Sequence, residues 1–310
     1  MKDSISVAIP LFNRAEWISK TLDHILAQTV SVDEIVICDD GSTDSLDESL
    51  RPYGDKVKVV RIPNSGPAAA RKVAIEESVG SWIALCDSDD YWAPDHIENF
   101  AKALQKYPST NLFFSNFVTS ERPESTKFGM APSGWMEEVS EQYIDSTETI
   151  VKCADNILKA FLKYQACFPS CIVFDRDLYR SVGGIHSKVS RWASEDFHLT
   201  ARLFAVANSV MSTEATVTIN KHDNNFSREY IKNIEGEILV FSDILHYDLV
   251  PLRFRGPIKD KVSDLELQLF RNYYWSGQYE KARDVGLRIK KDNFCSRDWL
   301  RFVFSCFRLL

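Results

Sequence analysis

Residues 82–90 read WIALCDSDD, an apolar run that ends in three carboxylates. Trp82–Cys86 has the length and composition of a buried β-strand, because strands covered on both faces are short and continuously apolar. Asp87, Ser88 and Asp89 follow directly at the carboxyl end of that strand. Open α/β sheets bind their ligands beyond the carboxyl ends of their strands. The stretch therefore predicts a buried strand of such a sheet and a polar site beside it.

The sequence around this stretch alternates short apolar runs with helical patterns. Strands are expected at residues 6–9, 34–38, 57–62 and 111–118, and helices at 17–26, 67–79 and 95–106. Pro67 and Gly80 stand where a helix begins and ends. The alternation predicts an α/β fold with a mostly parallel sheet flanked by helices.

The second half of the chain is less regular. We expect a loop at 121–142, helices at 151–164 and 196–207, strands at 168–174 and 210–219, and only helices from Tyr230 onward. This predicts a domain over 1–228, with a nucleotide-binding half at about 1–120 and an acceptor half at about 121–228. A helical C-terminal extension is expected at 229–310, with the boundary near Arg228.

Polar, turn-forming clusters follow the first four expected strands. They comprise residues 10–14 (PLFNR), 39–44 (DDGSTD), 64–67 (NSGP) and 87–90 (DSDD). The carboxyl ends of parallel strands meet at one edge of a sheet, so these clusters are expected to lie together.

Asp87 and Asp89 are the clearest candidates for metal binding. Side chains alternate along an extended chain, so both carboxylates should point to the same side. Mg²⁺ typically takes one or two protein carboxylates together with substrate phosphates. A solvated acidic turn is the alternative, because Asp and Ser are common in turns.

Two further clusters have both a functional and a structural interpretation. Asp39 and Asp40, at a strand end, can accept hydrogen bonds from a base or a ribose. Alternatively, they belong to a strand–turn–helix connection in which Ser42 or Thr43 caps the helix. Arg71 lies one turn into a helix opened by small residues, where the helix N-terminus favours anions. It can contact phosphate, pair with an Asp or lie on the surface.

Composition excludes some functions. The 310 residues carry a net charge of -7, which gives no support for a nucleic-acid partner. The seven cysteines are irregularly spaced and include no C-x-x-C pair. This pattern favours a protein of the reducing cytosol, and it argues against a zinc site. No secretory signal and no apolar stretch of membrane-spanning length is evident. These features predict a cytoplasmic protein.

The C-terminal tail differs in charge from the rest. Lys281–Leu310 contains eight Lys or Arg and three Asp or Glu, so it carries +5 and leaves -12 elsewhere. Arg297, Arg301 and Arg308 share one helical face, and apolar residues fill most of the remainder. Such a helix can lie on the inner face of an anionic membrane, or it can pack on the domain or on a second subunit.

At this point the motifs resemble those of the family-2 glycosyltransferases of the GT-A fold. The resemblance covers about residues 4–228 and rests on five motifs in order. They are VAIPLFNR at 7–14, DDGSTD at 39–44, GPAAAR at 66–71, DSD at 87–89 in the place of the DxD motif, and GG at 183–184 followed by ED at 195–196. A departure is Lys72, where relatives often have Asn after the Arg.

The resemblance implies a role for each matched position. Nucleotide binding is implied for Pro10, Phe12, Asn13, Arg14, Asp39, Asp40, Arg71, Asp87 and Ser88. Asp89 would ligate Mg²⁺ or Mn²⁺, with His222 as a further metal or phosphate contact. Trp192 and Glu195 would lie on the acceptor side, and Asp196 would be the catalytic base.

The implied reaction is metal-dependent transfer of a sugar from a nucleotide diphosphate sugar, expected to be a UDP-sugar, to an acceptor hydroxyl with inversion. The acceptor would be a saccharide or a lipid-linked molecule of cell-surface polysaccharide or glycolipid synthesis. A nucleotidyltransferase is an alternative, although the loop at 10–14 has no glycine for its phosphates. A non-catalytic nucleotide-sugar-binding module should lack an acid at 89 or 196, and both acids are present.

Overall fold

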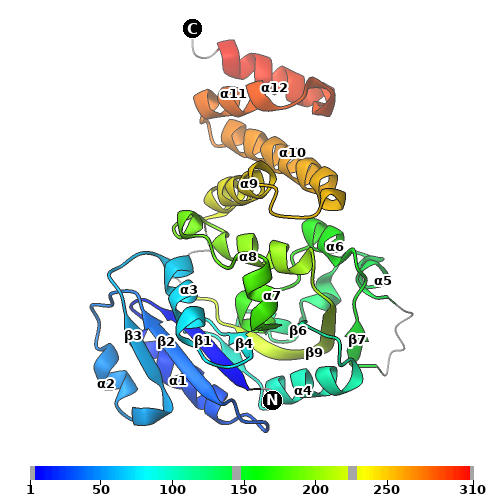
Figure 1. The fold of residues 1–310 in the computed structure, drawn as a ribbon. Coiled ribbons are helices and arrows are strands. Elements are labelled where there is room, and N and C mark those ends of the chain that lie inside the picture. The colour runs from blue at the N-terminus through cyan, green and yellow to red at the C-terminus, as the bar shows by residue number, and fades with distance from the viewer. Residues whose placement is uncertain (1–3, 142–147, 223–228, 308–310) are drawn as a thin grey trace. The chain divides into compact units, whose positions relative to one another are not determined.

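The computed structural model describes residues 4–141, 148–222 and 229–307 (Figure 1). The chain divides into two units. The first lies within Met1–Arg191 and Leu199–Asp223, and the second within Trp192–His198 and Asn224–Leu310. The expected boundary at Arg228 falls outside the described residues.

The first unit is built on a nine-stranded mixed sheet in the order β3-β2-β1-β4-β8-β6-β9-β5, with β7 paired to β9 (Figure 1). The strands are β1 (Ile5–Leu11), β2 (Glu34–Asp39), β3 (Lys58–Arg61), β4 (Trp82–Leu85), β5 (Tyr91–Trp92), β6 (Leu112–Thr119), β7 (Ile150–Lys152), β8 (Ile172–Asp175) and β9 (Ser209–Ile219). Strands β3, β2, β1 and β4 are mutually parallel, and β8 runs antiparallel to β4 and to β6. The sheet is therefore parallel through β4 and mixed beyond it.

Helices cover this sheet. They are α1 (Ala15–Leu26), α2 (Leu46–Leu50), α3 (Pro67–Glu77), α4 (His96–Lys106), α5 (Trp135–Val139), α6 (Ile157–Lys163), α7 (Arg176–Ser181) and α8 (Glu195–Phe204), whose first turn belongs to the second unit. Every residue of β1 is buried. Helix α3 packs on β1 and β2 through buried alanines, so its backbone comes close to the sheet.

The region around 121–174 corrects the expected boundaries. Ile150 and Val151, at the expected start of a helix, instead pair with Ser212 and Met211 of β9. A three-residue strand gives too short a signal for periodicity, and β-branched residues suit an edge strand. The expected strand at 168–174 begins only at Ile172, because Pro169 opens a 3₁₀ turn. The expected loop at 121–142 includes α5 and a 3₁₀ turn at Phe128–Met130.

The second unit is helical, as expected. Its helices are α9 (Tyr230–His246), α10 (Leu252–Trp275), α11 (Tyr279–Arg288) and α12 (Ser296–Phe307). Consecutive helices pack on one another along the chain. Within the part of the chain that the structure describes, none of the helices combines the length and the apolar composition needed to cross a bilayer.

Candidate active site

The loops after β1 and β2 are tied together by two reciprocal hydrogen bonds. The Asn13 amide donates to Ser42 Oγ at 2.9 Å, and the Thr43 amide donates to Asn13 Oδ1 at 2.8 Å. Asp39 Oδ1 accepts from the Ser42 amide at 2.8 Å, and Asp39 Oδ2 lies 3.3 Å from Arg61 Nε. Asn13 has a φ of 49°, in the left-handed region that Asn tolerates better than most residues. The two turns therefore form one polar edge.

Asp40 fixes the third loop. Its carboxylate accepts from the amides of Ser65 at 2.6 Å and Gly66 at 2.8 Å, and the residue is 2% exposed. Gly66 has a φ of +98°, and a Cβ there would lie 2.5 Å from the carbonyl oxygen of Ser190. Asp40 therefore positions the start of α3 and with it Arg71. Its contact with a nucleotide base stays a prediction.

The carboxyl end of β4 gathers opposite charges. Arg71, 5% exposed, reaches Asp87 with an Nη2 to Oδ1 distance of 3.1 Å. The Asp87 amide donates to Ser170 Oγ at 2.9 Å, and the Ser88 carbonyl accepts from Thr21 Oγ1 at 3.1 Å. These bonds tie the backbone of the DSD turn to the 3₁₀ turn before β8 and to α1.

Asp89 is the centre of the site. Its Oδ2 accepts from Arg14 Nε at 3.1 Å and lies 2.9 Å from His222 Nε2. The His222 ring stacks on Trp17, with centroids 5.0 Å apart and planes 13° apart. Asp89 is 9% exposed. The structure thus brings together Arg14, Asp89 and His222, three residues that the sequence motifs predicted as site residues from three distant segments.

Asp90, next in the chain, belongs to the site although the sequence motifs predicted no role for it. It accepts from Ser170 Oγ at 2.5 Å and from the Asn220 amide at 2.9 Å. Burial raises its pKa well above the usual range, and the charges of Asp87 and Asp89 raise it further. By bonding residue 220, Asp90 holds the segment that carries His222 beside Asp89. The third acid of the DSDD run was the only sequence signal for it.

The side-chain atoms at Asp89 are suitable ligands for a divalent cation. Carboxylate oxygen is the preferred ligand of Mg²⁺ and Mn²⁺, and imidazole nitrogen is a ligand of several transition metals. Asp89 and His222 present one carboxylate oxygen and one imidazole nitrogen within hydrogen-bond distance of each other.

Two other residues expected in the nucleotide site lie at the end of β1. Pro10 is buried in β1, and Phe12 is 42% exposed just beyond the end of that strand.

The remaining nominated residues, Trp192, Glu195 and Asp196, belong to the second unit. Glu195 opens α8 and is 8% exposed, and Asp196 follows it in the first turn. Ser194 has a φ of 59°, and its carbonyl accepts from the Phe197 amide at 3.0 Å. The N-terminal position expected for Asp196 is therefore correct, and its role as a base stays a prediction.

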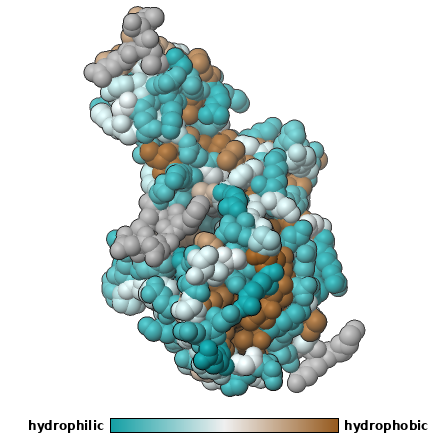
Figure 2. Space-filling model, turned by 90° about the vertical axis from the view of Figure 1, so that its left-hand side faces the viewer, coloured by the Kyte–Doolittle hydropathy of each residue, from teal (hydrophilic) through white to brown (hydrophobic). Residues whose placement is uncertain are grey.

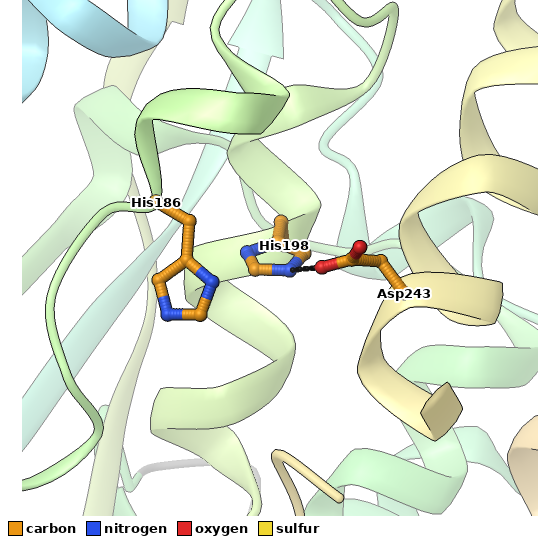
Figure 3. Close-up of side chains that lie close together, drawn as sticks. All are labelled: His186, His198 and Asp243. Carbon is orange, nitrogen blue, oxygen red and sulfur yellow. Dashed lines mark hydrogen bonds and ion pairs between the residues drawn. The ribbon is translucent and has the colours of Figure 1, made fainter. Parts of the chain in front are cut away.

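This unit also buries a polar pair. Nε2 of His198, on α8, lies 3.2 Å from Oδ2 of Asp243, on α9, and the two side chains are nearly inaccessible (Figure 3). A Cβ at Gly236 would lie 2.1 Å from the carbonyl oxygen of Ala193, so only glycine allows α9 to approach the segment before α8. These contacts fix the first turn of α8 on α9.

Comparison with known proteins agrees with this arrangement. The model of the family described as Glycosyl transferase family 2 matches residues 6–183. The chain belongs to this family. It is 36% identical over 126 residues to an uncharacterized glycosyltransferase of Rickettsia felis, and 39% identical over 105 residues to the chondroitin synthase of Pasteurella multocida. These matches cover 40% and 33% of the chain, but only 20% and 11% of the relatives' lengths.

Solved structures show the same fold. Residues 1–349 of TarS from S. aureus superimpose with a TM-score of 0.61 at 18% identity, covering 97% of this chain and 79% of TarS. The mannosyltransferase PcManGT from Pyrobaculum calidifontis, in complex with GDP-Man and Mn²⁺, gives 0.59 at 18% identity, covering 99% and 80%. The expected α/β GT-A fold with a helical C-terminal part is confirmed.

Proposed function

We propose that this protein transfers a sugar from a UDP-sugar to an acceptor hydroxyl, with inversion at the anomeric carbon. The observation that carries the proposal is the meeting of Arg14, Asp89 and His222 at the carboxyl end of β4, in a chain of glycosyl transferase family 2. TarS has been solved with UDP-GlcNAc and PcManGT with GDP-Man and Mn²⁺, which supports a nucleotide diphosphate sugar as the class of donor.

The residues of the first unit would hold the donor. The joined turns at Asn13 and Asp39 present polar groups to the base and the ribose. Arg14 and Arg71 are cations at the same sheet edge, and each is paired with an Asp of the DSD turn. In the donor complex they would turn toward the diphosphate, because phosphate is a strong bidentate partner of guanidinium.

Asp89 and His222 would hold Mg²⁺ or Mn²⁺, which neutralises charge on the departing nucleoside diphosphate. Asp196 would accept the proton of the acceptor hydroxyl as that oxygen attacks the anomeric carbon. Its position in the first turn of α8 suits this role, because the helix dipole stabilises the carboxylate form that a base needs. Trp192 and Glu195 would contact the acceptor.

The acceptor would be a saccharide or a lipid-linked molecule of cell-surface polysaccharide or glycolipid synthesis, reached from the cytoplasm. A panel of UDP-, GDP- and deoxythymidine diphosphate sugars, incubated with the protein and Mn²⁺, tests the donor class through the nucleotide released. Release from a UDP-sugar above all others, lost in Asp89→Asn, is the expected result. Release from none of them, with nucleotide binding intact, would favour a binding module instead.

A further inference from the structure

Helix α12 turns an apolar face outward. Trp299, Leu300, Val303, Phe304 and Phe307 are exposed at 40%, 72%, 44%, 41% and 69%. They follow one another at intervals of one and three residues, so they line a single side of the helix. An amphipathic helix of a globular protein ordinarily packs this side on its core. In Figure 2 the C-terminal helices show some hydrophobic residues on a mainly hydrophilic surface.

The opposite side of α12 explains this orientation. Asp298 is completely buried and accepts from Arg271 Nε at 3.0 Å, Arg271 Nη2 at 2.7 Å and Arg301 Nη1 at 2.7 Å. Ser305 is buried on the same side. Rotating the helix would break the two charge-assisted hydrogen bonds from Arg271, which lies on α10, and such bonds are about twice as strong as neutral ones. The buried carboxylate therefore determines that the apolar side faces outward.

The same arrangement leaves the outer side of α12 without an acid of its own. Asp298 is the only acid of α12, and it points inward. Arg297 is exposed, and helical geometry places it at one border of the apolar face, next to Arg301, whose guanidinium bonds Asp298. Amphipathic helices with Trp, Phe and Leu on one side and basic residues at its border bind in the headgroup region of anionic bilayers.

We propose that α12 is a docking surface for an anionic lipid bilayer, into whose headgroup region the five apolar side chains insert. A second copy of the chain is the less suitable occupant. A two-fold contact brings each patch against itself, so the exposed Arg297 would face no exposed acid on the α12 of the other copy. Anionic lipid supplies the opposite charge. The inference goes beyond the proposed function and does not depend on the donor site.

Co-sedimentation of the full chain with vesicles tests this surface. Vesicles of phosphatidylcholine with added phosphatidylglycerol should bind the protein, and vesicles of phosphatidylcholine alone should bind it weakly. Exchanging Leu300→Ser and Phe307→Ser together should lower the affinity by about tenfold or more. The matched control exchanges Val79→Ser and Leu252→Ser, both 81% exposed and outside α12, and should bind like the wild type.

A second readout does not depend on those two exchanges. Brominated lipids in the anionic vesicles should quench tryptophan fluorescence, and Trp299→Phe should remove much of the quenching while binding persists. Equal binding by the wild type and the Leu300/Phe307 double variant would overturn the proposal. A concentration-dependent dimer that this variant abolishes, with no vesicle binding, would assign the surface to a second copy. Nucleotide release with a soluble acceptor should be the same in both proteins, which separates this test from that of the proposed function.

Discussion

Nε2 of His222 lies 2.9 Å from Oδ2 of Asp89, although 133 positions separate the two residues in the chain. Strand β9 carries the chain back to the sheet edge where β4 ends, and the Asn220 amide bonds Asp90 Oδ1 at 2.9 Å. The acid beside Asp89 therefore anchors the segment that brings His222 to it. A carboxylate and an imidazole meet at the place where the expected donor diphosphate would bind.

Exchanging Asp89→Asn should abolish nucleotide release and remove the effect of Mn²⁺ on UDP binding. The amide keeps the size of the side chain but loses the charge that a hard cation requires. Titration calorimetry of UDP with Mn²⁺ or EDTA measures the effect. Asp55→Asn, at an exposed acid of the 3₁₀ turn Gly54–Lys56, is the control. Full activity of the Asp89→Asn variant, or of the wild type in EDTA, would refute a metal role.

The exchange Asp196→Asn should lower kcat by roughly 10² or more, because it removes the proton acceptor. UDP affinity and melting temperature should remain close to those of the wild type, since Asn also suits a helix N-terminus. Steady-state kinetics with the best donor give the comparison. If the Asp196→Asn variant retains most of its kcat, the base lies elsewhere and Glu195 becomes the next candidate.

Gly66→Ala should destabilise the first unit more than Gly134→Ala. Both glycines have positive φ, at 98° and 82°, but only a Cβ at 66 meets the backbone, 2.5 Å from the Ser190 carbonyl oxygen. We expect a loss of about 1–3 kcal/mol beyond the Gly134 control. Urea unfolding gives these energies. UDP binding should also weaken at position 66 alone, because Gly66 precedes the helix of Arg71. An equal loss of unfolding free energy in the two variants would show that the backbone at Ser190 moves away from the new Cβ at no cost.

His96 should make the protein less stable in mild acid. Burial lowers its pKa to about 3 from 6.5, and its Nδ1 lies 2.8 Å from Thr216 Oγ1. Above pH 6.5 neither the folded nor the unfolded chain protonates the ring. Below it only the unfolded chain takes up the proton, so stability falls as the pH drops from 6.5 toward 3.

Between pH 6.5 and 5 this effect amounts to about 1.6 kcal/mol. Urea unfolding at the two pH values should therefore show a smaller loss for His96→Gln than for the wild type. Parallel losses in the wild type and the His96→Gln variant would show that other groups cause the acid sensitivity.

Sequence alone was sufficient for the strands β1, β2 and β4 and for the helices α1, α3 and α4. These segments carry continuous apolar runs or helical periodicity. Pro67 marks the start of α3, but the helix ends at Glu77, three residues before Gly80, with Ser78 at its C-cap. The sequence also located the polar turns at the carboxyl ends of these strands, because that position follows from the parallel order. Short edge strands such as β7 escaped it, because their pairing with β9 is a long-range interaction.

What only the tertiary structure decided is which groups satisfy one another. From the sequence alone, Asp40 and Arg71 could either contact a ligand or pair within the protein. In the fold Asp40 accepts hydrogen bonds from two backbone amides, and Arg71 donates one to Asp87. Trp17, Asp90 and Ser170 belong to the site only through contacts between distant segments, since Trp17 stacks on His222 and Ser170 bonds Asp90. The face that α12 turns outward depends on Asp298 and Arg271, since a buried carboxylate must be paired, whereas an apolar side chain can lie on either side.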